Sequence, residues 1–324
     1  MSSTLAIQPD NLPTPSNETW KYTNLPRAIK ALPANLNRAE DEKETIIHLK
    51  KGEIREEPIE IIFTGEDSSY HINQVKIKLE EGAQATIIER HDGSGQYWKN
   101  RVTGIAVGKN AILRHIRIQN DSKQAVNTNI THISADQNAV YDGFSLNIGG
   151  KLARHEIHAE IQGEHAEVSF NGINVLNEDQ HGDTTILIEH QEPNCKSNQF
   201  YRTLLDDKAR GVFQGKVHVH QKAQKTDGYQ LANTLLLSPE AEMDTKPELE
   251  IYADDVKCSH GTTTGQLDED PLFYLRQRGL SEAEARLMLV RAFVDEVVDK
   301  VSNDDIREEI TNIANTWLSN ALKA

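Results

Sequence analysis

The sequence predicts a mainly β protein that ends in a helical domain, on three observations. Between residues 44 and 266, apolar side chains recur at every second position in short stretches such as "VKIKL" and "GKVHVH", which is the period of a β-strand. Gly, Asn and Asp separate these stretches, as turns require, and no amphipathic helix interrupts them. After residue 266 the apolar period becomes that of an α-helix. We therefore expect an N-terminal arm (1–43), a β core (44–266) and a C-terminal helical domain (267–324).

The N-terminal arm is polar and rich in Pro and Asn. Its segment "SNETWKYTNLPRAIKAL" predicts one short helix, which Ser16 or Asn17 would cap. Pro26 is poorly placed for a long continuous helix, because proline removes a backbone donor. We interpret this zone as an arm on the core rather than as a domain of its own.

A weak repeat indicates how the β core is built. Turn segments with a small residue recur at Ala85, Ala111, Ala139 and Ala166, at intervals of 26, 28 and 27 residues. A near-constant period in a region of strands favours a β-solenoid, in which each coil buries its inward side chains against its neighbours. The repeat has no other invariant residue, so a β-sandwich and a double jelly roll stay open as alternatives on this evidence.

The C-terminal domain carries ordinary helix signals. "LDEDPLFYLRQRGL" has acidic residues and Pro271 at its start and Gly279 at its end. The next helix opens with Ser281 and Glu284, the pattern of a capping box. It and the last helix each carry one apolar stripe, so we expect an antiparallel hairpin that packs on the β core or presents a groove to another protein. The stripes consist of Leu287, Val290, Val294, Val297 and Val301, then Ile306, Ile310, Ile313 and Trp317.

Charge and composition disfavour several classes of function. The 35 basic and 50 acidic residues give a net charge of −15, which argues against binding to nucleic acid or to an anionic membrane surface. No apolar run is long enough to span a bilayer, and the N-terminus lacks the basic and apolar regions of a signal peptide. The two cysteines, Cys195 and Cys258, fit a reducing compartment better than a secreted one. We expect a cytoplasmic protein with no nucleic-acid or membrane partner.

Cys258 and His260 form the first candidate site, in "YADDVKCSHGTTTG". The apolar phase slips at Asp254–Asp255, which predicts a corner, and beyond it the two side chains lie on one strand face. Thiolate and imidazole together suit zinc, iron or an iron–sulfur species. A closed site needs about four ligands, however, and two are local. On spacing alone the preferred interpretation is a packed Cys258 and a His260 that caps the turn at Gly261.

His218 and His220 form the second candidate, because "GKVHVHQ" places both on one strand face. Such a pair supplies two metal ligands in cupin-type barrels, so a cupin-like metalloenzyme is the alternative function. A pair of exposed or hydrogen-bonded histidines explains the pattern equally well. His155 and His158 are three apart, which predicts opposite faces and no site. No P-loop pattern is present, so we expect no nucleotide bound by this chain.

The stretch from about residue 200 to 298 resembles the SufB/SufD family, the scaffold subunits of the Suf system for iron–sulfur cluster assembly. The motif "KCSHGTTTGQLDEDPLFYLRQRG" is similar to the SufD branch rather than to SufB, and "ETWKYTNL" is similar to that branch's Trp-Lys-Tyr-Thr segment. The middle of the chain matches loosely. The resemblance implies a right-handed parallel β-helix core with a helical C-terminal domain.

The same resemblance implies a non-enzymatic scaffold. It would pair with a SufB-like paralogue and bind a SufC-like ABC ATPase through its C-terminal helices, so that ATP hydrolysis resides in the partner. A transient iron–sulfur cluster would form between the two scaffold subunits. His260 maps onto the family's cluster ligand and Cys258 onto the neighbouring cysteine. A homodimer stays open as an alternative assembly.

Two features depart from the family. The N-terminal zone is short compared with longer members, which leaves its role in partner contacts without support. Cys195, in "EPNCKSNQF", matches no family cysteine and is interpreted as structural.

Overall fold

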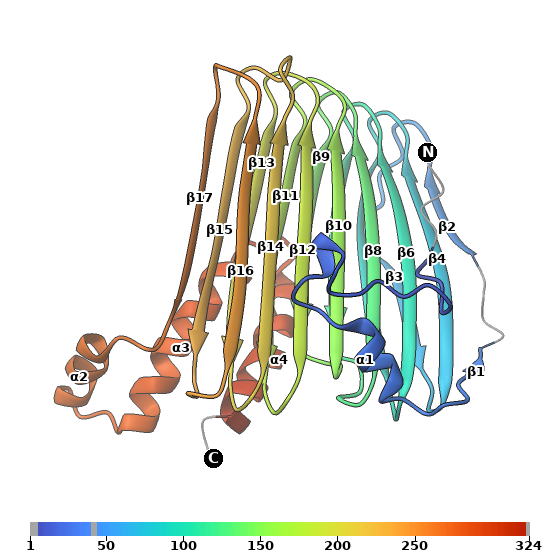
Figure 1. The fold of residues 1–324 in the computed structure, drawn as a ribbon. Coiled ribbons are helices and arrows are strands. Elements are labelled where there is room, and N and C mark those ends of the chain that lie inside the picture. The colour runs from blue at the N-terminus through green and yellow to red at the C-terminus, as the bar shows by residue number, and fades with distance from the viewer. Residues whose placement is uncertain (1–5, 40–43, 322–324) are drawn as a thin grey trace.

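The computed structural model describes residues 6–39 and 44–321, and within them the chain forms a parallel β-solenoid of about eight turns (Figure 1). Each turn contributes one strand to each of two sheets, and the strands pair in parallel throughout these residues. Parallel pairing excludes the sandwich and jelly-roll alternatives, which consist of antiparallel strands. The predicted fold class, mainly β with a β-helix core, is confirmed. The predicted boundary at residue 43 lies outside the described residues.

Two sheets face each other along the solenoid. Sheet A contains β1 (Asn37–Arg38), β2 (Glu44–Leu49), β4 (Ser69–Leu79), β6 (Tyr97–Val107), β8 (Val126–Ala135), β10 (Leu152–Ile161), β12 (His181–His190), β14 (Arg210–Val219) and β16 (Glu242–Ile251). Sheet B contains β3 (Ile59–Gly65), β5 (Gln84–Gly93), β7 (Ile112–Gln119), β9 (Val140–Asn147), β11 (Glu167–Leu176), β13 (Lys196–Leu205), β15 (Asp227–Leu236) and β17 (Lys257–Gly265).

One turn of each coil explains the repeat in the sequence. In four successive coils a residue with positive φ precedes a fully buried small residue, and these pairs are Asn110–Ala111, Asn138–Ala139, His165–Ala166 and Asn194–Cys195. In the preceding coil the equivalent residue is Ala83, after Gly82, whereas Ala85 is an inward residue of β5. The predicted repeat was therefore wrong at its first position. Cys195 is buried, and its thiol donates to the Gly163 carbonyl at 3.2 Å, so it packs where the other coils have alanine.

The N-terminal arm lies across the outer face of sheet A (Figure 1). The prediction of a single helix in this arm is wrong, because the segment forms a 3₁₀ turn, η1 (Glu18–Trp20), and a separate short helix, α1 (Leu25–Lys30). Pro26 lies in the first turn of α1, where proline is tolerated, and Asn24 caps this helix by accepting from the Arg27 backbone N–H at 3.0 Å. The proline therefore starts a second helix instead of extending the first.

Trp20 and Thr23 fix the arm to the sheet. The Trp20 ring is buried and lies 4.0 Å from the Arg154 guanidinium carbon. The Thr23 hydroxyl is fully buried and donates to Asp183, which also pairs with Arg154. Both residues belong to the "WKYT" segment, so this motif anchors the arm over a charged pair on sheet A.

The C-terminal helices are α2 (Glu269–Gln277), α3 (Glu282–Val298) and α4 (Asp304–Ala321). Ser281 and Glu284 form the predicted capping box. The predicted stripes of α3 and α4 share one apolar cluster with outward residues of sheet B, so the hairpin packs on the β core. Arg90 of β5 pairs with Glu309, and Arg202 of β13 pairs with Glu296, at the edges of this contact. α2 projects beyond β17 at the end of the solenoid (Figure 1). In the described part of the chain, no helix has the length and apolarity that crossing a membrane requires.

Candidate functional site

The last coil leaves the C-terminal end of the solenoid open. β16 ends sheet A and β17 ends sheet B, and no further strand pairs with either of them in the described residues. The predicted corner is present, because β16 ends at Ile251 and β17 begins at Lys257. Two neighbouring edge strands with free backbone groups form a surface that another chain can extend.

Cys258 and His260 both lie on β17, on the face directed toward the solenoid interior. Cys258 pairs in register with Gly228 of β15, and His260 pairs with Gln230. Cys258 is half-buried beside an apolar cluster that contains Val217, whereas His260 is exposed because no further coil covers it. Burial raises the pKa of the Cys258 thiol above its ordinary value. The thiol is therefore protonated near neutral pH, and binding to a metal would have to displace its proton.

The packing interpretation of the pair is half right. Cys258 does pack as a small apolar residue. His260 does not cap a turn, because Gly261 lies within β17 and the strand continues to Gly265. The sequence predicted a turn at Gly261, but β17 continues through the three threonines that follow it.

Two buried glutamines stand behind His260 inside the solenoid. Gln199 of β13, Gln230 of β15 and His260 follow one another in register. Both glutamine side chains are fully buried and lie against Gly215, where an added Cβ would stand 2.1 Å from Gln230 Nε2 and 2.8 Å from Gln199 Oε1. Gln230 Nε2 donates to the Gly215 carbonyl at 3.4 Å, while Gln230 Oε1 has no partner. A buried acceptor without a partner thus lies on β15, the strand that pairs with β17, beside the exposed imidazole of His260.

The described residues offer an incomplete metal site. Nowhere in residues 6–39 and 44–321 do three or more His, Cys, Asp or Glu side chains gather in an arrangement that could hold a metal ion. The Cys258–His260 pair would supply two ligands at most, and the remaining positions would have to come from elsewhere.

The alternative pair faces away from the interior. Val217 and Val219 of β14 are buried inward, so His218 lies on the outer face of sheet A. The His218 and His220 rings are stacked, with centroids 4.5 Å apart, and His220 Nε2 lies 3.5 Å from Glu189. A β-solenoid is not a cupin barrel, and no third ligand joins the two rings among the described residues. His155 and His158 lie on opposite faces, as predicted: His155 is half-buried on the inward face, and His158 binds Glu156 outside.

Comparison with known proteins decides the family. Residues 61–293 match the family model described as the SUF system FeS cluster assembly, SufBD core domain. This chain belongs to the SufB/SufD family.

Individual members of the SufB/SufD family agree with this assignment. The chain is 32% identical over 296 residues to the iron-sulfur cluster assembly protein SufD of Escherichia coli, covering 88% of this chain and 70% of that protein. It is 35% identical over 281 residues to the SufBD family protein slr0076 of Synechocystis, covering 83% of this chain and 62% of the relative. It is 32% identical over 281 residues to the chloroplastic protein ABCI7 of Arabidopsis thaliana, covering 82% and 59%. The chain thus spans roughly three-fifths to seven-tenths of the length of these relatives.

Proposed function

We propose that this protein is a cytoplasmic, non-enzymatic scaffold subunit that holds a nascent iron–sulfur cluster at a junction with a second scaffold subunit. The observation that supports it most is the position of His260, exposed on the last strand of the solenoid beside an edge that can accept another chain. Membership of a cluster-assembly family gives the chemistry of the cargo. His260 would be one ligand of the cluster, with Cys258 as a second ligand after loss of its proton.

Incomplete ligation suits a scaffold better than a storage site. With half of the ligands on each subunit, the cluster is stable while the junction is closed and is released when the junction opens. A closed set of four ligands on one chain would hold the metal too firmly for transfer. We propose that this chain binds no nucleotide itself, so that ATP hydrolysis would reside in a partner subunit.

Gln230 would orient the His260 imidazole. Its unpartnered Oε1 lies one strand behind the ring, and a ring N–H that donates to it would leave the other ring nitrogen free for iron. Such a hydrogen bond fixes the tautomer and raises the basicity of a metal-binding histidine.

A SufB-like paralogue is the partner that the charge of the open end favours. β16 carries Glu242, Asp244, Glu248 and Glu250 but one lysine, Lys246, and Arg210 and Lys216 of β14 compensate part of this negative charge. A second copy of this chain would bring a second acidic strand to the junction, whereas a paralogue with basic residues there would complement it. A homodimer through the same edge is the competing assembly.

A SufC-like ABC ATPase would bind the projecting helix α2. Phe273 and Tyr274 are 64% and 56% exposed on α2, and Met288 is 49% exposed on α3. Large apolar side chains exposed at neighbouring positions, as Phe273 and Tyr274 are on α2, mark protein-binding surfaces. Motion of the ATPase on ATP binding could then be transmitted to the junction and open it.

Affinity purification of the tagged chain from native extract tests the proposal. We expect a related solenoid subunit and an ABC-type ATPase to co-elute in a defined ratio, with iron and sulfide in the complex. Elution as a metal-free homodimer with no ATPase, confirmed by mass measurement, would contradict it.

A further inference from the structure

The interior of the solenoid is polar and charged toward its N-terminal half. Two buried carboxylates there each have a cationic partner: Glu89 binds Arg101 at 2.6 Å, and Asp121 binds Lys99 at 2.5 Å. Glu89 also lies 3.3 Å from His115 Nε2. Burial of these charges is tolerated because each carboxylate is paired and hydrogen-bonded.

Arg117 is the third cation of this interior, and it lacks a carboxylate of its own. It is 3% exposed, and its Nη2 donates to Asn127 Oδ1 at 3.3 Å. Its register neighbour Glu89 is already occupied by Arg101, and no carboxylate oxygen of the described residues lies within 4 Å of the Arg117 guanidinium. Burial, and then repulsion from Arg101, lower its pKa to about 10, so it stays charged near neutral pH. Three cations against two carboxylates leave one buried positive charge without compensation.

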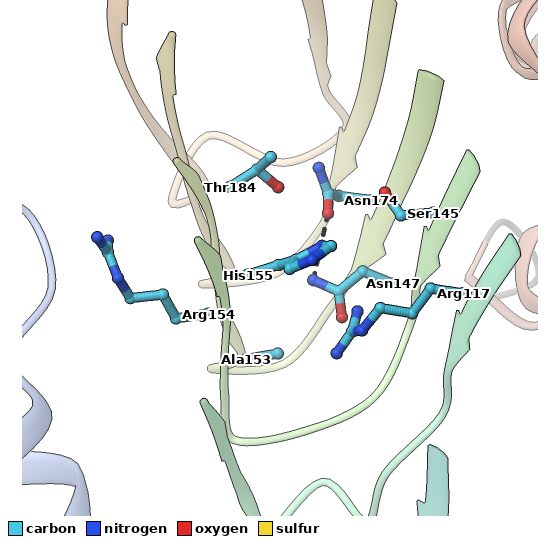
Figure 2. Close-up of a pocket in the computed structure, with 8 residues that line it drawn as sticks. All are labelled: Arg117, Ser145, Asn147, Ala153, Arg154, His155, Asn174 and Thr184. Carbon is cyan, nitrogen blue, oxygen red and sulfur yellow. Dashed lines mark hydrogen bonds between the residues drawn. The ribbon is translucent and has the colours of Figure 1, made fainter. Parts of the chain in front are cut away.

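A small cavity lies beside this unpaired cation (Figure 2). The Arg117 guanidinium, the Asn147 amide and the His155 ring converge on it, whereas Arg154 points away toward the N-terminal arm. The cavity has room for about one water-sized group. Arg117 Nε, Asn147 Oδ1 and His155 Nδ1 are all buried and without a hydrogen-bond partner.

The cavity can present donors from all three side chains. His155 Nε2 lies 3.0 Å from the Thr131 hydroxyl, and burial holds the His155 pKa well below its ordinary value, so the ring is neutral and its Nδ1 can carry the single proton. Arg117 Nε always carries a proton.

The Asn147 amide can also turn a donor toward the cavity. Its Nδ2 donates to Asn174 Oδ1 at 3.2 Å, and Asn174 Nδ2 donates to the Thr203 hydroxyl at 3.3 Å. Reversing both amides keeps both hydrogen bonds, because a hydroxyl can donate as well as accept. The Asn147 NH₂ group then faces the cavity.

We propose that the cavity between Arg117, Asn147 and His155 binds a small monovalent anion of the halide class, chloride being the abundant member. Chloride is larger than the water-sized space, so the side chains that line the cavity must move outward slightly to admit it. The anion compensates the buried charge of Arg117 and accepts from Arg117 Nε, His155 Nδ1 and the Asn147 amide. The site lies inside the solenoid on β7, β9 and β10, remote from the Cys258–His260 edge, and it does not depend on the proposed function.

Crystallography with bromide as the probe tests the site directly. The full chain is unfolded, refolded and crystallised with sodium bromide as the sole halide, and diffraction is recorded at the bromine absorption edge. We expect an anomalous peak within hydrogen-bond distance of Arg117 Nε and His155 Nδ1. Density for a water molecule without anomalous signal would overturn the proposal.

Thermal unfolding gives a second, independent readout in solution. The midpoint is measured in sodium chloride and in sodium gluconate at equal ionic strength for the wild type, for Arg117→Met and for the matched control Arg114→Met, which changes an outward residue of β7. We expect a saturating rise of the midpoint with chloride in the wild type and in the control, and no such rise in Arg117→Met. An equal response to chloride in all three proteins would overturn the proposal. If Arg117→Met does not fold, the bromide crystals of the wild type still decide.

Discussion

Replacing Phe273 with Ala tests whether α2 binds a partner ATPase. An aromatic side chain carries roughly 200 Å² of surface, and Phe273 is 64% exposed, so about 130 Å² is left for a partner to cover. At about 25 cal/mol per Å², this area is worth about 3 kcal/mol, or a factor of about 100 in affinity as an upper bound. Since binding also orders the side chain, we expect a 10- to 100-fold weaker complex.

Isothermal titration of the scaffold complex with the co-purified ATPase measures this loss. Ile62→Ala is the matched control, because Ile62 is 59% exposed but lies on β3 at the opposite end of the solenoid. Both variants should unfold within about 0.5 kcal/mol of the wild type, since both side chains are exposed. Equal ATPase affinity for Phe273→Ala and Ile62→Ala would refute the assignment of α2 as the binding surface.

Three further predictions concern the arm, acid stability and the orientation of His260. Trp20→Ala should lower the free energy of unfolding by about 3–5 kcal/mol in urea titration, because it uncovers the buried Arg154; a loss below about 1 kcal/mol would show that the arm does not stabilise the core. Burial alone raises the pKa of Glu156, but hydrogen bonds from His158 and Arg154 outweigh it and lower that pKa to about 2. The stability that this carboxylate contributes is therefore present above pH 4.5 and is lost as pH falls toward 2. In Glu156→Gln, the loss in the free energy of unfolding over this pH range should be smaller than in the wild type by up to about 3 kcal/mol. An unchanged pH profile of the urea midpoint would contradict this. Gln230→Leu should weaken iron binding by the assembled complex about 10- to 100-fold without changing subunit pairing. Gln199→Leu should leave the iron affinity unchanged, and equal iron affinity in the two variants would rule out the orienting role.

The β core and the final helices could be predicted because their side chains follow simple periods. A strand of the solenoid has one buried and one outer face, and α3 and α4 each bury one stripe, so alternation and helical spacing are visible in the sequence. Alternation alone did not separate a solenoid from a sandwich, because both bury one face of a strand. The first repeat position was misplaced for a related reason: Ala83 at the turn and Ala85 on the strand are both small and buried.

The neighbours of the candidate site could not be predicted in the same way. Gln199, Gln230 and His260 are about thirty residues apart and meet because successive coils stack in register. Their spacing is a signal that could have been found once the coil length was known. The buried cluster around Glu89 and Arg117 was missed because its residues alternate with isoleucines that face the helices on the other side of sheet B, and charged side chains on such strands are expected to be exposed.

The most direct measurement is the iron and sulfide content of the complex reconstituted with His260→Ala, together with its visible absorption. His218→Ala is the matched control, because it removes an imidazole from the outer face of the neighbouring sheet. The account predicts that His260→Ala assembles with its partners, folds as stably as the wild type and yields little bound cluster, while His218→Ala loads normally. A full cluster content in the His260→Ala complex would contradict the claim that this exposed imidazole is a ligand at the junction.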